Sequence, residues 1–342
     1  MEKSHYFIKE RSDISSVSLR EINRFPKFYN YFIKYLNINR KLGQREIDSI
    51  ILSLYFCYYL RIPTRNLRKE YINKIINSVK FNNEIIPFLE VTKRESDYIT
   101  DKLLEGKIGY AKNKGLSENL FSEFICLNNK EPLIICGKPG SSKSLSVRIL
   151  LDAMKGNNSR NEFLKQFKEI IPSFYQCSLS STSQSVLKVF ERARKKLKYK
   201  NNNIISLVFM DEMGIADESQ NNPLKVIHSE LDNNIEIERE EEKISFIGIT
   251  NWSLDASKMN RAINVVVEEP DLDYLIETSK EIIRIINKDL IFNNEELIKA
   301  ICEAYLNYKN DYLPQNNKED FHGYRDFYYL IKYIFYNISE NP

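Results

Sequence analysis

The spacing of hydrophobic residues changes near residue 131 of the chain. Before that point apolar side chains recur every three or four residues, which predicts helices across residues 1–100. One such helix is predicted over 19–36, where Pro26 is expected to kink or split it. The polar stretch 92–118 is interpreted as a connection. The clearest helical row consists of Ile47, Ile50, Ile51, Leu54 and Tyr58.

After residue 131 short apolar runs alternate with helical segments. Strands that alternate with helices form a parallel sheet covered on both faces. The strands are predicted at Leu133–Cys136, Phe174–Cys177, Ile204–Met210, Ile244–Thr250 and Ile263–Val267. The helices between them are predicted at about 143–155, 183–198, 223–232 and 255–261. Beyond Pro270 the pattern is helical again, at about 272–287, 294–307 and 324–337.

These patterns predict three parts of the chain. Residues 1–100 form an N-terminal helical segment, residues 101–269 an α/β core, and residues 270–342 a C-terminal helical lid. The predicted fold class is therefore α/β, with a five-stranded parallel sheet that carries helices on both faces.

Composition and charge exclude several classes of protein. The 342 residues are 42% hydrophobic, which is ordinary for a globular protein and too high for a disordered one. A formal charge of +3 gives no overall field that would draw the chain to nucleic acid. The longest charge-free apolar stretch, Ile50–Leu60, is far shorter than the roughly 20 residues of a membrane helix. We therefore expect neither a nucleic-acid partner nor a membrane span.

The numbers and spacings of the cysteines and histidines exclude a further class of protein. Five cysteines at scattered positions and three histidines leave no spacing typical of a zinc site, which excludes an ordinary Cys/His zinc module within this chain. Isolated cysteines further indicate a reducing, intracellular compartment. We therefore expect a cytoplasmic protein.

A loop with the character of a phosphate-binding loop follows the first predicted strand and precedes a helix. Gly137 and Lys143-Ser144 fit the pattern GxxxxGK[ST], while Ser142 replaces the second glycine and Gly140 stands two residues earlier. In this motif, backbone N–H groups surround a phosphate at the positive end of the following helix. We expect Ser142 to adopt near-helical backbone angles, which a non-glycine residue allows. The predicted nucleotide-binding residues are Gly137, Lys138, Pro139, Gly140, Ser141, Ser142, Lys143, Ser144 and Leu145.

The chemistry of a nucleotide site assigns roles to individual side chains. Lys143 is expected to reach the β- and γ-phosphates, and the Ser144 hydroxyl to ligate Mg²⁺. The strand over 204–210 ends in two carboxylates, Asp211 and Glu212. Asp211 is expected to hold Mg²⁺ together with Ser144, and Glu212 to act as the general base toward the attacking water. Two acids indicate a hydrolase better than one would.

Three further polar residues follow predicted elements of the core or open the last helix. Asn251 follows the strand over 244–250 and is expected to point at the γ-phosphate, because ligands of such sheets lie at the carboxyl ends of the strands. A capping or turn asparagine is the alternative. Arg261 precedes the last strand, a location suited to an arginine finger offered to a neighbouring subunit. Arg325 opens the last helix and is expected to reach the γ-phosphate from the lid. For both arginines a surface position is the alternative.

Several of these segments resemble one unit of the mysterin family, the giant dynein-like AAA+ ubiquitin ligases. The resemblance covers about 116–336 and includes the phosphate loop, in which serine for glycine is typical of that family's last catalytically competent unit. Residues 16–60 resemble the cap helices of the preceding unit. Besides the loop, the resemblance rests on Met210–Ala216, Phe246–Asp255, Lys258–Arg261 and Gly323–Phe327.

The resemblance implies a P-loop AAA+ core that binds ATP and Mg²⁺ and has neighbouring AAA+ units, in cis or in trans, as partners. The family's ligase activity does not carry over, because it needs zinc-bound and cysteine-bearing parts elsewhere in the large protein. A ubiquitin-system context follows only through full-length relatives. By this resemblance the site residues are Lys143, Ser144, Asp211, Glu212, Asn251, Arg261 and Arg325.

Two functions follow from the sequence. The first is an ATPase that converts the hydrolysis of Mg-ATP into movement of the helical lid against its neighbours. The second is an interaction module that binds ATP to fix the geometry between domains without appreciable hydrolysis. The second is motivated by Arg261, because an isolated unit has no neighbour to supply or receive it.

Overall fold

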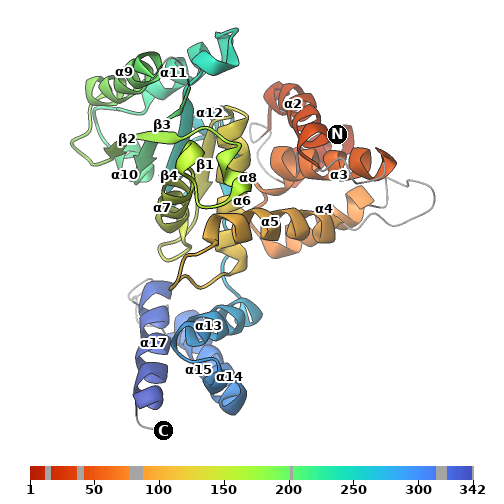
Figure 1. Ribbon diagram of the computed structural model, residues 1–342, viewed down its shortest axis with the longest axis vertical. Coiled ribbons are helices and arrows are strands. Elements are labelled where there is room, and N and C mark those ends of the chain that lie inside the picture. Colours follow the sequence, from red (N-terminus) through yellow and green to blue (C-terminus); the bar gives the residue numbers. More distant parts are fainter. Residues whose placement is uncertain (12–16, 37–41, 77–87, 201–202, 313–321, 341–342) are drawn as a thin grey trace.

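The sheet and its helices form the centre of the molecule, with the N-terminal helices on one side and the C-terminal helices at one end (Figure 1). Within the described ranges, every helix is too short or too polar to span a bilayer. The computed structural model describes residues 1–11, 17–36, 42–76, 88–200, 203–312 and 322–340.

The N-terminal segment is helical, as its apolar spacing predicts. Its helix α2 begins at a capping box, in which the Ser18 hydroxyl accepts a hydrogen bond from the backbone and Glu21 accepts one from the Ser18 N–H. The helices are α1 (Glu2–Arg11), α2 (Leu19–Tyr35), α3 (Leu42–Leu54), the π-helix Tyr55–Tyr59, α4 (Arg65–Ile76) and α5 (Phe88–Leu104).

Aromatic rings join this segment to the core. The ring centroids of Phe28 and Phe56 lie 5.1 Å apart, and those of Phe56 and Phe121 lie 5.3 Å apart. Phe121 belongs to α6 (Lys114–Asn128), which packs against the sheet. Because such ring pairs bury large apolar surfaces, the N-terminal helices and one face of the sheet share a single hydrophobic core.

The sheet consists of five parallel strands in the order β2-β3-β4-β1-β5. This arrangement confirms the predicted α/β fold class. Cys136 pairs with Thr250 on one side and with Val266 on the other, while Gln176 pairs with Asp211, so the carboxyl ends of the strands lie along one side of the sheet. The strands are β1 (Leu133–Cys136), β2 (Ile170–Gln176), β3 (Ile205–Asp211), β4 (Ser245–Thr250) and β5 (Ile263–Val266).

Helices cover both faces of the sheet. Because successive strand residues point to opposite faces, Ile134 belongs to one apolar core and Ile135 to the other. The core around Ile135 contains α6 and α7 (Lys143–Ala153), and the core around Ile134 contains α9 (Ser183–Tyr199) and α11 (Lys225–Glu236). The short helices α8 (Glu162–Lys165), α10 (Met213–Asp217) and α12 (Ala256–Met259) lie in the connections.

The C-terminal helices have an apolar core of their own, formed by residues such as Leu275, Ile298 and Phe327. Asp271 starts this part by capping α13, since its side chain accepts a hydrogen bond from the Tyr274 N–H. The helices are α13 (Leu272–Ile286), α14 (Asp289–Asn293), α15 (Glu295–Asn307), the π-helix Tyr308–Tyr312 and α17 (Tyr324–Glu340).

Three sequence predictions about these elements are wrong. Helix α2 is not split at Pro26, which lies on its exposed side, and Phe28 and Phe32 of the same helix are buried. Strand β2 begins at Ile170 rather than Phe174. Because β2 is an edge strand, it tolerates Pro172 and is only partly buried, with its two buried residues, Ile170 and Ser173, three positions apart, which hides its apolar pattern.

The third error concerns the stretch 92–118, which is not a connection. It holds most of α5 and the start of α6. The buried side of α5 carries Thr92, Glu95 and Ser96, and these polar side chains conceal its helical periodicity.

Candidate nucleotide-binding site

A cavity of about 390 Å³ opens at the carboxyl ends of β1, β4 and β3. Because β4 lies between β1 and β3, Asn251 at its end stands between the glycine-serine loop and Asp211. The structure therefore brings most of the sequence-predicted site residues around one space. The lining consists of loop residues 139–145 with Asp211, Glu212, Ile249, Asn251, Arg325 and Tyr328.

The backbone of the loop is left-handed at two positions. Gly140 has φ +89° and Ser142 has φ +61°. The near-helical conformation expected of Ser142 is therefore wrong, because the chain turns at this residue to enter α7 at Lys143. A left-handed side-chain-bearing residue costs roughly 1–2 kcal/mol. Glycine is required at 137, where an added Cβ would lie only 2.9 Å from Ser141 Oγ.

The Lys143 side chain is folded back into the loop and is 6% exposed. Its Nζ donates hydrogen bonds to the carbonyls of Gly137 and, at 3.0 Å, of Lys138. Burial lowers the pKa of Lys143 to about 8. An anion in the cavity would stabilise the ammonium form and would compete with these carbonyls for it.

Ser144 and Asp211 form a pair suited to Mg²⁺. The Ser144 hydroxyl donates to Asp211 Oδ2 over 3.3 Å. Adjacent ligands of an octahedral Mg²⁺ are about 3 Å apart, so both oxygens fit one ion. Among the described residues no three His, Cys, Asp or Glu side chains could share a metal ion. Mg²⁺ here would depend on phosphate oxygens and water for its other ligands, as it often does.

Glu212 has a strained backbone and a partner outside the cavity. Its φ is +55°, in the left-handed region. Its carboxylate Oε2 accepts a hydrogen bond of 2.8 Å from the side-chain amide of Gln176, at the end of the neighbouring strand β2. Strain of this kind is found at functional sites, where the surrounding structure maintains it. Sequence reasoning missed Gln176, since a lone glutamine at a strand end matches no motif.

Two basic side chains near the cavity, those of Arg325 and Lys138, point in different directions. Arg325 lines the cavity from the first turn of α17, as predicted for a residue of the lid. The backbone there is close to the loop, because a Cβ on Gly140 would lie 3.2 Å from the Arg325 nitrogen. The Lys138 side chain instead pairs with Glu269 at 2.9 Å, and neither Lys138 nor Gly137 lines the cavity.

Arg261 lies apart from the cavity of its own chain. Its Nε donates to Asp232 Oδ2 at 2.9 Å, and its NH1 group donates to the Ser257 carbonyl at 2.7 Å. The side chain is 19% exposed. The structure thus separates Arg261 from the other predicted residues.

Two buried residues of α6 hydrogen-bond to the loop and to the start of α7. Asn119 Nδ2 donates to the Ser141 carbonyl at 3.1 Å, and Glu123 Oε1 accepts a 2.6 Å hydrogen bond from the Ser146 hydroxyl. Both side chains are fully buried, and burial raises the pKa of Glu123 well above its usual value. The only sequence signal for them was two polar residues four positions apart in an apolar helix.

This fold and site define an AAA-type α/β domain: a parallel five-stranded sheet with a glycine-serine loop after β1 and an acidic pair after β3. Residues 109–273 match a family model described as the RNF213 AAA domain. The chain therefore carries an AAA unit of the mysterin (RNF213) family, as the sequence resemblance implies.

Individual relatives extend this likeness over nearly the whole chain. Over 96% of its length the chain is 30% identical to the E3 ubiquitin-protein ligase rnf213-beta of Danio rerio and 29% identical to the E3 ubiquitin-protein ligase RNF213 of Homo sapiens. Over 97% it is 29% identical to RNF213 of Mus musculus. The chain spans 6–7% of the length of these relatives.

Proposed function

We propose that the chain is an ATPase unit, which binds Mg-ATP in the cavity and couples its hydrolysis to movement of the helices α13–α17. The observation that carries this proposal is the position of Ser144 and Asp211, a hydroxyl and a carboxylate 3.3 Å apart, beside Glu212 in one cavity. A pair with this spacing fits Mg²⁺, and a second acid next to it can serve as a base.

In the proposed reaction the N–H groups of the loop bind the phosphates, and Lys143 turns toward them from the carbonyls that it now contacts. Mg²⁺, when bound, neutralises charge on the β- and γ-oxygens. Glu212 accepts the proton of the attacking water, which Asn251 orients. Arg325 brings a positive charge from α17 to the same cavity, so the lid responds to the charge of the nucleotide.

The proposal extends to the partners. Arg261 acts on the nucleotide of a neighbouring AAA+ unit, in cis or in trans, and residues 1–100 serve as the lid of a preceding unit. A ubiquitin-system context rests only on the ligase names of the relatives. The five free cysteines are all buried thiols, which fits a cytoplasmic location.

The test is a titration with ATP and Mg²⁺, followed by a hydrolysis assay at several protein concentrations. Glu212→Gln should retain ATP and turn it over slowly, and Lys143→Ala should lose nucleotide. Lys155→Ala, at an exposed position beyond the end of α7, is the matched control and should bind normally. Action of Arg261 in trans should make the specific activity rise with concentration. Equal hydrolysis by the unaltered chain and Glu212→Gln would overturn the proposal.

A second function is an ATP-binding module that fixes the geometry between domains without appreciable hydrolysis. The observation that favours it is the ion pair between Arg261 and Asp232, which holds the arginine within its own chain. Measurable single-turnover hydrolysis by the purified chain, abolished by Glu212→Gln, would exclude it.

A further inference from the structure

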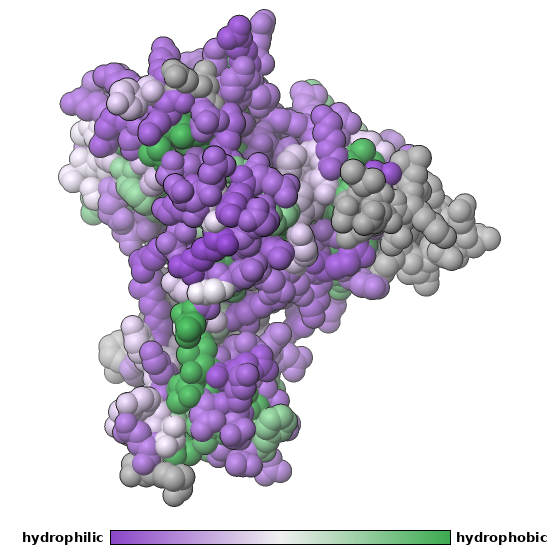
Figure 2. Space-filling view, viewed as in Figure 1, coloured by the Kyte–Doolittle hydropathy of each residue, from purple (hydrophilic) through white to green (hydrophobic). Residues whose placement is uncertain are grey.

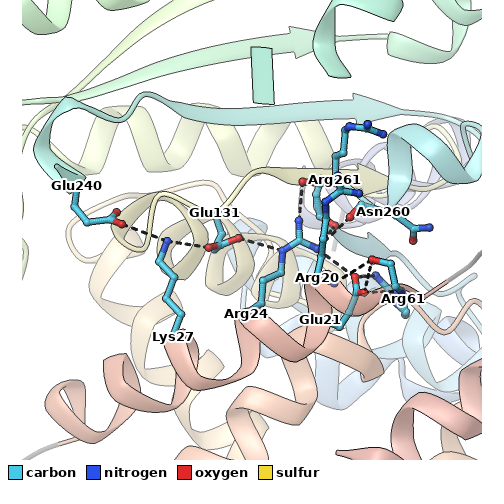
Figure 3. A network of polar contacts seen from close by, with 11 residues as sticks. Arg20, Glu21, Arg24, Lys27, Arg61, Glu131, Glu240, Asn260 and Arg261 are labelled. Carbon is cyan, nitrogen blue, oxygen red and sulfur yellow. Dashed lines mark hydrogen bonds and ion pairs between the residues drawn. The ribbon is translucent and has the colours of Figure 1, made fainter. Parts of the chain in front are cut away.

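The turn that carries Arg261 is bound by a helix from the N-terminal segment. Residues 260–262 connect α12 to β5, and the side chains of α2 reach this turn from more than 230 positions earlier in the chain (Figure 3). Because Arg261 is the residue proposed to act on a neighbour, contacts that hold its turn bear on that action.

Arg24 binds the main chain of the turn at three points. Its NH2 group donates to the Arg261 carbonyl at 2.7 Å. Its NH1 group lies 3.3 Å from the carbonyls of Asn260 and of Ala262. One guanidinium therefore contacts three successive carbonyls, which lie just beyond the C-terminal end of the short helix α12.

The same guanidinium is held from its other side by buried acids. Its Nε donates to Glu131 Oε2 and its NH1 group to Glu21 Oε1, each at 3.2 Å. Arg24 is 5% exposed, Glu21 is fully buried and Glu131 is 7% exposed. NH1 has two hydrogens for three of these acceptors, so one hydrogen is shared, and the planar guanidinium contacts two carboxylates and three carbonyls at once, which a lysine ammonium cannot do.

The side chain of Arg261 is held as well. Asp232 accepts from Arg261 with Oδ2 and from Arg20 of α2 with Oδ1, the latter at 3.2 Å. Among the described residues, the hydrogen bonds of the Arg261 side chain use its Nε and one NH1 hydrogen, and its other three donors are available to an anion. The guanidinium is thus oriented in advance, so less side-chain freedom is lost when it binds a phosphate.

We propose that Arg24 is a positioning residue for Arg261, through which the N-terminal helices determine whether this unit can stimulate hydrolysis in its neighbour. The inference rests on the proposed action of Arg261 in trans. Removal of the Arg24 side chain takes away its three hydrogen bonds to the carbonyls of residues 260–262, and the main chain from which the Arg261 side chain extends is then held less firmly.

The test mixes two variants of the full chain. The acceptor carries Arg261→Ala and keeps its own nucleotide site, while the donor carries Glu212→Gln and offers Arg261 without hydrolysis of its own. The rise in ATP hydrolysis on addition of donor measures the action of Arg261 in trans. The donor is then made with a second change, either Arg24→Lys or, as the matched control, Lys27→Met. Lys27 lies on the same helix and pairs with Glu131 at 2.9 Å.

We expect the Arg24→Lys donor to stimulate the acceptor at least about tenfold less in kcat, because small displacements of reacting groups have such effects. The KM of the acceptor for ATP and the ATP affinity of the donor's own site should stay unchanged, which shows that the donor is folded. The Lys27→Met donor should stimulate normally.

Equal stimulation by the Arg24→Lys donor and its parent overturns this inference and leaves the proposed function intact. Equal losses with Arg24→Lys and Lys27→Met also overturn it, because they would show general loosening of α2. Absence of stimulation by the parent donor overturns the proposed role of Arg261 itself.

Discussion

The side-chain amide of Gln176 donates a 2.8 Å hydrogen bond to Glu212 Oε2, although Gln176 does not line the cavity that Glu212 faces. The hydrogen bond holds the carboxylate toward the end of β2. Hydrogen bonds to charged groups contribute about 1.5–3 kcal/mol, so this donor would compete with a water in the cavity for the carboxylate of Glu212.

We expect Gln176→Leu to raise single-turnover ATP hydrolysis about threefold or more, because it removes this competing donor. Affinity for ATP should not change. Gln176→Asn, which keeps an amide on a shorter stem, is the control and should give a smaller increase. A lower rate with unchanged ATP binding would show instead that Gln176 holds Glu212 in its reactive position.

The lowered pKa of Lys143 predicts proton uptake on nucleotide binding. Below pH 8 the ammonium is already present, so affinity should be independent of pH there. Above pH 8 the free protein has lost this proton, and phosphates bind the charged form better, so affinity should fall as the pH rises. Calorimetry at pH 9 in buffers of different ionisation enthalpy should detect uptake of nearly one proton per ATP, by the same linkage. In Lys143→Arg the uptake should vanish, because arginine stays charged.

The left-handed backbone of Ser142 predicts a stabilising substitution. Ser142→Gly removes a steric cost of about 1–2 kcal/mol and adds an entropic cost of about 0.5–1 kcal/mol, so the free energy of unfolding should rise by roughly 0.5–1 kcal/mol. Denaturant unfolding measures this change. Ser142→Ala keeps the Cβ and should leave the stability unchanged. A destabilised Ser142→Gly would contradict the assigned backbone strain.

Glu123 is expected to be a neutral carboxylic acid, because burial raises its pKa well above the usual value and, among the described residues, its hydrogen-bond partner is the uncharged Ser146 hydroxyl. Glu123→Gln, which is neutral and nearly isosteric, should change the free energy of unfolding by less than about 1 kcal/mol. Glu123→Ala should lower the free energy of unfolding by about 2–4 kcal/mol, because it leaves an empty space in the core. It should also weaken ATP binding, because that space lies next to Ser146 in the first turn of α7, which follows the loop. A large loss with Glu123→Gln would indicate an ionised carboxylate.

The sequence predicted those parts of the site that directly follow an apolar run in the chain. The loop, Asp211 and Asn251 each follow an apolar run, so a parallel sheet places them at one end. Gln176, Asn119 and Glu123 could not be found this way, because their roles depend on packing between elements. The backbone of Ser142 was likewise set by the entry into α7 rather than by local preference.

The same limit explains the errors in the fold. Central strands such as β3 are buried on both faces and give continuous apolar runs, whereas the edge strand β2 is only partly buried and contains Pro172. Helix α5 was missed because it buries polar side chains. The contacts of Arg24 with residues 260–262 join segments so far apart that no local pattern could have revealed them.

The N-terminal and the C-terminal helices are joined to the sheet in different ways. On the N-terminal side, the Leu60 carbonyl accepts a 2.8 Å hydrogen bond from the Val266 N–H of β5, and the aromatic core is continuous from Phe28 to Phe121. The C-terminal helices have a separate core. The N-terminal helices and the sheet therefore share one apolar core, whereas α13–α17 join the sheet through the short connection before residue 272 and through contacts such as that of Arg325 with Gly140.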